Sequence, residues 1–135
     1  MAQKTVIAFG VFDGLHKGHA YFLQEAKKLG DYLIAVTPSD DIVKKIKNHL
    51  PKNNLQERVK HLRSLKFIDE VVPSNESLNN WGILEKYQPD IIAIGYDQAR
   101  LKTALENHFK KTSKKIELKV ISSFEPHKYK SSLIA

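Results

Sequence analysis

Cysteine is absent from the 135 residues of this chain. Disulfide bonds, metal sites built from thiolates and a cysteine nucleophile are therefore excluded. A chain without cysteine is compatible with a reducing compartment, in which disulfides are rare.

Long apolar runs are also lacking. The first run, TVIAF at 5–9, is too short for the core of a signal peptide or for a membrane span, and no later run reaches that length. We therefore expect a cytoplasmic protein that has no membrane partner.

The composition is that of a globular protein, with 41% hydrophobic and 27% charged residues, and the length suits one domain over residues 1–135. Positive charge dominates, with a net charge of +7, which favours anionic partners such as nucleic acids or phosphorylated metabolites. Aromatic residues interleaved with Lys and Arg, as a single-strand platform needs, are not found, so we expect no nucleic-acid partner. Lysine residues cluster at 44–47 (KKIK) and at 110–115, and the second cluster is interpreted as a solvated helix face.

Short apolar, β-branched runs recur along the chain and predict five strands, at 5–9, 32–36, 69–72, 90–94 and 118–121. The runs at 32–36 and 90–94 are apolar nearly throughout, which is typical of strands buried on both faces of a parallel sheet. Apolar residues with helical spacing lie between them, at 20–29, 55–65, 81–87 and 101–109, and a further helical segment, short and basic, begins at Ser39. This alternation predicts an α/β fold, a doubly wound five-stranded parallel sheet in a single domain.

Ligands of such folds bind beyond the carboxyl ends of the strands. Four connecting segments follow predicted strands, at 10–19, 37–47, 95–100 and 122–132. We expect these four loops to converge on one crevice.

Glycine is scarce, and three of the six glycines, Gly10, Gly14 and Gly18, lie in one short loop. Their spacing matches neither GxGxxG nor GxxxxGK[ST], so the dinucleotide fingerprint and the P-loop are excluded. A glycine loop that opens a helix still favours phosphate, because the first amides of the helix are free and the dipole is positive there. His16 and His19 lie three residues apart, so both imidazoles can face the same anion.

Other interpretations of the two histidines stay open at this point. A zinc site would need a third ligand, and no carboxylate or histidine completes a local pattern. General acid–base work would need a nucleophile, and no serine or cysteine lies in the motif. The two residues could also be ordinary helix-start residues without a ligand.

The segment GVFDGLHKGH resembles the signature of the HxGH nucleotidyltransferase superfamily, the cytidylyltransferase-like group. Further landmarks follow in order: VKKIK, QERVKHLRSLKFIDEVV (56–72), PDIIAIGYDQ (89–98) and YKSSLI (129–134). The resemblance implies a Rossmann-like fold and transfer of a nucleoside monophosphate from a nucleoside triphosphate to a phosphorylated acceptor, with release of pyrophosphate. It also implies Mg²⁺, held mainly by phosphates and water with Asp13 or Asp97 as candidate ligands, and a homodimer.

The resemblance carries roles over to matching positions. His16 and His19 would contact the α- and β-phosphates, and Lys47, eleven residues before Arg58, would be the phosphate-binding lysine, with Lys44 as a second candidate. Arg58 would orient a loop or the acceptor, although a surface salt bridge on its helix is the plain alternative. The remaining nucleotide-binding candidates are Phe9, Gly10, Val11, Phe12, Asp13, Gly18, Gly95, Asp97, Ser131 and Ser132. For Asp13 a role in stabilising its loop, and for Asp97, Ser131 and Ser132 helix capping, are the alternatives.

Two departures from the family bear on the substrate. Val11 stands where threonine is common, and EPHKYK carries no arginine before the serines, although cytidylyltransferases usually have one there. Lys128, Lys130 or His127 would have to replace its charge, and lysine lacks the bidentate fork. FDGLHKGH and IGYDQ are similar to archaeal-type FAD synthases, which favours FMN as acceptor and ATP as donor, although such enzymes usually end in a cysteine-bearing tail. CTP with glycerol 3-phosphate or another polyol or sugar phosphate is the alternative, and a nucleotide-binding module without catalysis is the other class.

Overall fold

The computed structural model describes residues 3–74, 81–112 and 116–122. Its strands are β1 (Thr5–Phe9), β2 (Tyr32–Pro38), β3 (Glu70–Ser74), β4 (Ile91–Gly95) and β5 (Glu117–Ile121). Its helices are α1 (Lys17–Lys28), α2 (Asp40–Lys47), α3 (Leu55–Arg63), α4 (Gly82–Tyr87) and α5 (Ala99–Lys111). All strand pairs are parallel, in the order β3-β2-β1-β4-β5, which confirms the predicted doubly wound sheet.

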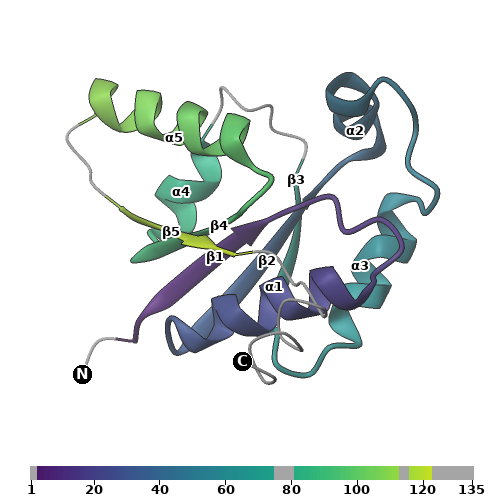
Figure 1. Ribbon diagram of the computed structural model, residues 1–135, viewed down its shortest axis with the longest axis horizontal. Coiled ribbons are helices and arrows are strands. Elements are labelled where there is room, and N and C mark those ends of the chain that lie inside the picture. The colour runs from purple at the N-terminus through teal and green to yellow at the C-terminus, as the bar shows by residue number, and fades with distance from the viewer. Residues whose placement is uncertain (1–2, 75–80, 113–115, 123–135) are drawn as a thin grey trace, which may run out of the picture.

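The alternation of side chains along β1 divides the core into two layers. Val6 and Ala8 pack in the cluster that includes buried residues of α1 and α3, whereas Ile7 packs in the cluster with α4 and α5. Figure 1 shows these two pairs of helices on opposite faces of the sheet. The central strands are therefore covered on both sides, which explains why β2 and β4 are apolar nearly throughout.

The predicted bounds differ from the observed ones mainly at strand ends. β2 continues to Pro38, because Thr37 and Pro38 still pair with Pro73 and Ser74 of β3. β4 begins at Ile91 rather than at Asp90, whose carboxylate instead accepts a hydrogen bond from the Thr5 backbone. The alternation of apolar and polar residues along one strand does not predict such pairings at strand ends.

β2 and β3 lie on one side of β1, whereas β4 and β5 lie on its other side, so the direction of strand succession reverses between β1 and β4. The β1–α1 loop, α2 and the β4–α5 loop all follow carboxyl ends of strands, and α2 lies at that end of the sheet in Figure 1. Beyond Ser122 the predicted fourth loop lies outside the described residues. No helix in the described ranges is long and apolar enough to cross a membrane.

Candidate functional site

A cavity of about 890 Å³ opens at the carboxyl ends of the strands. This volume is near the upper end of the range for small-molecule sites, about 300–1,000 Å³. The cavity brings together most of the predicted site residues: Phe9, Gly10, Val11, Phe12, Asp13, His16, Gly18, His19, Lys47, Gly95 and Asp97. Segments far apart in the sequence therefore meet as expected from the loop positions.

Two predicted residues do not line the cavity. Lys44 is exposed on α2, and Arg58 is buried beneath the loops. Ser131 and Ser132, together with the charged residues of EPHKYK, lie outside the described residues.

His16 is the N-cap of α1. Its Nδ1 accepts hydrogen bonds from the backbone amides of Gly18, at 3.0 Å, and His19, at 3.4 Å. His19 completes the capping box, because its Nδ1 accepts from the His16 amide at 3.4 Å. Nδ1 of each ring therefore caps the start of α1, whereas ligand binding by the other ring nitrogen stays a prediction.

The capping box also fixes the tautomer of both imidazoles. A neutral ring that accepts at Nδ1 carries its hydrogen on Nε2, so each histidine keeps one donor for a ligand. The rings of His16 and His19 stack with their centroids 3.7 Å apart, which holds the two donors side by side. Two adjacent N–H donors at the start of a helix, where the dipole is positive, suit the oxygens of a phosphate group.

Two glycines make room for this arrangement. A Cβ atom on Gly10 would lie 2.5 Å from Cζ of Phe12, so only glycine lets that ring lie over the backbone. A Cβ atom on Gly18 would lie 2.9 Å from Cε1 of His16. The capping position of His16 therefore depends on the missing side chain at Gly18. Phe12 itself has φ of 54°, a conformation that non-glycine residues adopt mainly under local constraint.

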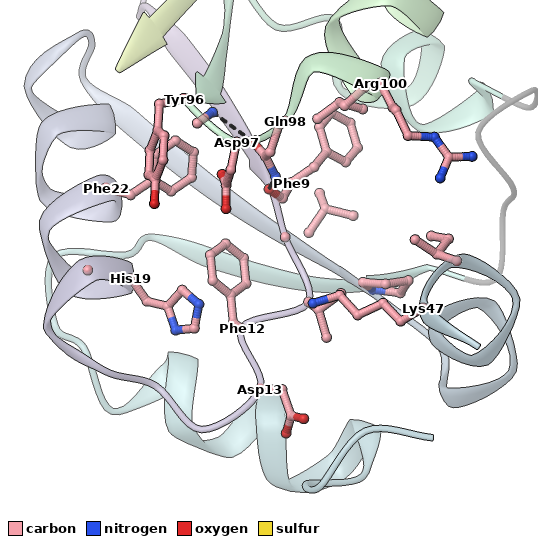
Figure 2. A pocket seen from close by; sticks show the side chains of 18 of the residues that line it. Phe9, Phe12, Asp13, His19, Phe22, Lys47, Tyr96, Asp97, Gln98 and Arg100 are labelled. Carbon is pink, nitrogen blue, oxygen red and sulfur yellow. Dashed lines mark hydrogen bonds between the residues drawn. The ribbon is translucent and has the colours of Figure 1, made fainter. Parts of the chain in front are cut away.

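Other predicted site residues affect the pKa of His19. Burial lowers the pKa of His19, and electrostatic interactions with His16 and Lys47 lower it further, against an opposing effect of Asp97 and Asp13. Figure 2 shows His19 and Lys47 on opposite sides of Phe12. These surroundings favour the neutral imidazole, which agrees with the tautomer set by its hydrogen bond.

The lowered pKa of His19 predicts a pH-dependent stability. The unfolded chain binds more protons than the folded one between the lowered pKa and the ordinary value of 6.5, so stability falls as pH falls below 6.5. Thermal melting above and below this pH measures the loss. In His19→Gln the loss of stability should be smaller, because the contribution of His19 is gone. Some loss can remain, since five other histidines are still present. An unchanged pH profile in the variant would show that His19 does not contribute.

Asp13 anchors the glycine loop to a distant segment. One of its carboxylate oxygens accepts from the Lys52 amide at 2.7 Å, and the other accepts from the Asn53 amide at 2.8 Å and from the Asn53 side chain at 3.0 Å. Burial raises the pKa of Asp13, but these hydrogen bonds and the charge of Arg58 outweigh it, and the pKa lies below its usual value. The geometry favours the loop-stabilising interpretation of Asp13.

Arg58 is fully buried, so the surface salt bridge that was its plain alternative is wrong. Its guanidinium donates to the Thr37 hydroxyl at 2.6 Å and to the Val11 carbonyl at 3.3 Å. It also donates to the Asp40 carboxylate at 2.7 Å and, through Nε, to the Asn53 carbonyl at 3.0 Å. One buried cation therefore joins the glycine loop, the end of β2, the start of α2 and the segment before α3.

Lys47 reaches the cavity because of how α2 begins and ends. Ser39 caps the helix by accepting from the Ile42 amide, and the lysines of KKIK occupy the last turn, where the helix dipole favours positive charge. Asn48 ends α2 with φ of 63°. The ammonium group of Lys47 points into the cavity in Figure 2. Of the lysines at 44–47, Lys47 thus lines the cavity, whereas Lys44 and Lys45 are exposed to solvent.

The β4–α5 loop is fastened by a residue that the sequence did not single out. Gln98 accepts from the Gly95 amide at 2.7 Å and donates to the Phe9 carbonyl at 2.7 Å, which joins the ends of β4 and β1. Helix α5 has no side-chain cap, so the capping alternative for Asp97 is not supported. The Asp97 carboxylate is exposed and, in the described residues, has no hydrogen-bond or ion-pair partner.

The described part of the chain offers few ligands for a metal ion. Within the described ranges, no three His, Cys, Asp or Glu side chains gather where they could hold one. The oxygens of Asp13 are engaged by amides, so Asp97 is the carboxylate of the cavity that remains available. This donor set fits Mg²⁺ that keeps its waters and binds mainly through substrate phosphates.

Several lining residues were missed as site residues. Trp81 and Ile83 were interpreted only as the apolar stripe of a helix, and Tyr96 and Arg100 were not singled out within the predicted loop 95–100, yet all four line the cavity. Tyr96 is 65% exposed in a loop that follows a buried strand. A large aromatic residue at that position was the available signal, because exposed aromatic groups beside loops often bind ligands.

Comparisons with known proteins agree with this geometry. A family model described as cytidylyltransferase-like matches residues 7–134. The FAD synthase of Thermococcus sibiricus is 41% identical over 128 residues, which cover 95% of this chain and 84% of that protein. The FAD synthase of Methanobrevibacter smithii is 36% identical over 133 residues, covering 96% of this chain and 86% of that protein.

A solved structure shows the same fold. The crystal structure of the lipopolysaccharide core biosynthesis protein from Thermoplasma volcanium aligns with a TM-score of 0.82 and 31% sequence identity, over 92% of this chain and 100% of that one. The motifs, the sheet and the family match agree with one another, and the chain therefore belongs to the cytidylyltransferase-like family of nucleotidyltransferases.

Proposed function

We propose that this protein is an FMN adenylyltransferase, which transfers AMP from ATP to FMN and releases pyrophosphate. The observation that carries the proposal is the likeness to FAD synthases over nearly the whole chain. The cavity supports it, because paired imidazole donors and a lysine lie where phosphate groups would bind. The family match over residues 7–134 supports a single catalytic domain over 1–135.

The reaction requires the two substrates to be aligned, and it needs no covalent intermediate with the enzyme. An oxygen of the FMN phosphate attacks the α-phosphorus of ATP, a new P–O bond forms, and the bond to the bridging oxygen of the leaving pyrophosphate breaks. Charge grows on the α-phosphate oxygens and on the leaving group as this happens. Fixed donors that point at those oxygens lower the barrier because they need no reorganisation.

The two histidines supply such donors. The Nε2–H groups of His16 and His19 would donate to oxygens of the α- and β-phosphates, while their Nδ1 atoms keep the rings on the helix. Lys47 would add a mobile positive charge from the opposite side of Phe12. Both sides of the triphosphate are then neutralised by groups of this chain.

Other residues would position these groups. Arg58 is assigned to loop orientation rather than to acceptor binding, because it is buried and does not line the cavity. Asp13 and Gln98 hold the loops that carry Phe9 to Phe12 and Gly95. Asp97 would face the nucleoside, as a carboxylate without a partner in the described part of the chain. Ser131 and Ser132 remain predictions from the family motif.

Mg²⁺, when bound, would neutralise phosphate oxygens and help the pyrophosphate to leave. Asp97 would be its candidate contact in this chain. The cytoplasmic location, the homodimer and the absence of nucleic-acid binding stay predictions of the sequence.

A pyrophosphate-release screen tests the proposed function. ATP and CTP are crossed with FMN, glycerol 3-phosphate and other phosphorylated acceptors, each with and without Mg²⁺. We expect turnover with ATP and FMN, with FAD as product in the chromatogram. Turnover only with CTP and a polyol phosphate would assign the alternative activity, and binding of nucleotide without any turnover would assign a binding module.

A further inference from the structure

The ladder between β1 and β4 ends earlier than the ladders on the other sides of these two strands. β1 pairs with β4 only as far as Ala8 opposite Ala93, whereas it pairs with β2 as far as Phe9. β4 likewise pairs with β5 as far as Gly95. Both strands therefore keep their strand geometry beyond the point at which they part, and the gap lies only between β1 and β4.

The register shows which hydrogen bond would come next in this ladder. The Gly10 amide donates to the Val36 carbonyl of β2 at 3.0 Å. Because successive residues of a strand direct their backbone groups to opposite sides, the carbonyl of the preceding residue, Phe9, faces β4. If the pairing continued, Phe9 would lie opposite Ile94, and the Gly95 amide would donate to the Phe9 carbonyl.

The side-chain amide of Gln98 takes the place of that hydrogen bond. Its Oε1 accepts from the Gly95 amide at 2.7 Å, and its Nε2 donates to the Phe9 carbonyl at 2.7 Å. These partners fix the orientation of the side-chain amide, because one of them only donates and the other only accepts. Both backbone groups are therefore hydrogen-bonded, although an amide group separates the two strand ends.

The gap coincides with the candidate site. The direction of strand succession reverses between β1 and β4, and ligands of such sheets bind at that point. The glycine loop continues from Phe9, the loop with Asp97 continues from Gly95, and both loops line the cavity together with Gln98. Figure 2 shows Gln98 next to Phe9 and Asp97. The spacing of the two loops therefore depends on the Gln98 side chain.

We propose that Gln98 is a positioning residue, a spacer that holds the ends of β1 and β4 apart and so sets the distance between the glycine loop and the Asp97 loop. It acts through the backbone of Phe9 and Gly95 rather than on the reacting atoms. The expected effect on catalysis rests on the proposed function, whereas the expected effect on strand spacing does not.

Gln98→Ala tests the spacer directly. Alanine leaves room for the Gly95 amide to donate to the Phe9 carbonyl, so we expect the crystal structure of the variant to show this hydrogen bond and a narrower crevice. The urea midpoint should change little, because the strand ladder satisfies the two groups that the side-chain amide satisfied before. In contrast, kcat/KM should fall about 10²-fold, because a displacement of about 1 Å in a site costs about that factor.

Gln98→Glu provides a readout that a purely structural role would not move. The new side chain has the same shape, but its ionised carboxylate only accepts, so one oxygen faces the Phe9 carbonyl without a donor. The protonated acid has one donor and one acceptor and can make both contacts again. Relative to the unmodified protein at the same pH, kcat/KM should be lowered about tenfold or more at about pH 8 and should recover toward about pH 5, because the facing carbonyl raises the pKa of the new carboxyl group.

The pH comparison isolates position 98, because the other titratable groups near it are the same in both proteins. Those that line the cavity are Asp13, His16, His19, Tyr21, Lys47, Lys52, Tyr96, Asp97 and Arg100. Lys102 follows one turn later on α5. Gln24→Glu is the matched control, since Gln24 is an exposed glutamine on α1 that does not line the cavity. Its kcat/KM should equal that of the unmodified protein at every pH.

The outcomes separate the spacer from the proposed function. If the Gly95 amide and the Phe9 carbonyl stay apart in crystals of Gln98→Ala, the spacer assignment is overturned. It is also overturned by an unchanged kcat/KM in Gln98→Ala, or by the same loss at every pH in Gln98→Glu. If the unmodified protein forms no FAD, the proposed function fails, and the crystal structure of Gln98→Ala still decides whether Gln98 separates the strands.

Discussion

His16→Asn is expected to lower kcat by roughly 10²- to 10³-fold while the protein keeps its fold. The asparagine side chain is a good N-cap and can still accept from the amides of Gly18 and His19. It cannot place an N–H group where Nε2 of His16 lies, so one donor to the transition state is lost, and such a loss costs about this factor. Steady-state turnover and thermal melting of the same preparations measure the two effects.

His16→Ala is the comparison that separates catalysis from capping. It should lose kcat to a similar extent, and in addition about 1 kcal/mol of unfolding free energy, because the cap of α1 is gone. His19→Ala should likewise slow turnover far more than it weakens folding. Normal turnover in His16→Asn would show that the ring serves only the helix.

Arg58→Met is expected to be the most destabilising single substitution in the site region, by about 3–5 kcal/mol. The methionine fills the space of the stem but leaves the Asn53 carbonyl and the Thr37 hydroxyl oxygen without their donor, and the Val11 carbonyl keeps only its hydrogen bond from the Thr37 hydroxyl. Asp40, which is 36% exposed, can be rehydrated, so the buried groups rather than the ion pair dominate the loss. Urea unfolding gives the value, and Arg63→Met, on the exposed face of α3, is the matched control.

Asp40→Asn tests whether Arg58 positions catalytic groups in addition to stabilising the fold. The change weakens the contact that holds the start of α2, the helix that carries Lys47, and leaves the contacts of Arg58 to Val11 and Thr37 in place. We expect a raised KM for ATP and a lowered kcat at a temperature where the variant is fully folded. Unchanged kinetic constants at that temperature would restrict Arg58 to a structural role.

The fold could be predicted from the sequence because local pattern and tertiary structure agree in it. The apolar runs at 32–36 and 90–94 became the central strands β2 and β4, and the helical stripe of Leu23 and Ala26 became the buried face of α1. Errors lie mainly at strand ends such as Thr37 and Pro38, where pairing with β3 decides the bound. A neighbour far along the chain cannot be inferred from a local pattern.

The candidate site could be predicted only in part. Motif positions gave the residues at the carboxyl ends of β1 and β4, which the cavity brings together. Burial of Arg58 and the anchoring of Asp13 could not be inferred, because both depend on contacts between segments far apart in the sequence, such as Asn53 with Asp13 and Arg58 with Val11. Trp81 and Ile83 were missed because a residue in an apolar stripe has the same pattern whether it faces the core or a ligand.

A crystal structure with Mg²⁺, FMN and an ATP analogue that cannot be cleaved at the α-phosphorus tests the central claim most directly. We expect the α- and β-phosphates to lie within hydrogen-bond distance of Nε2 of both His16 and His19, with the Lys47 ammonium group on their other side. A triphosphate bound elsewhere, with both imidazoles turned away from it, would contradict the account.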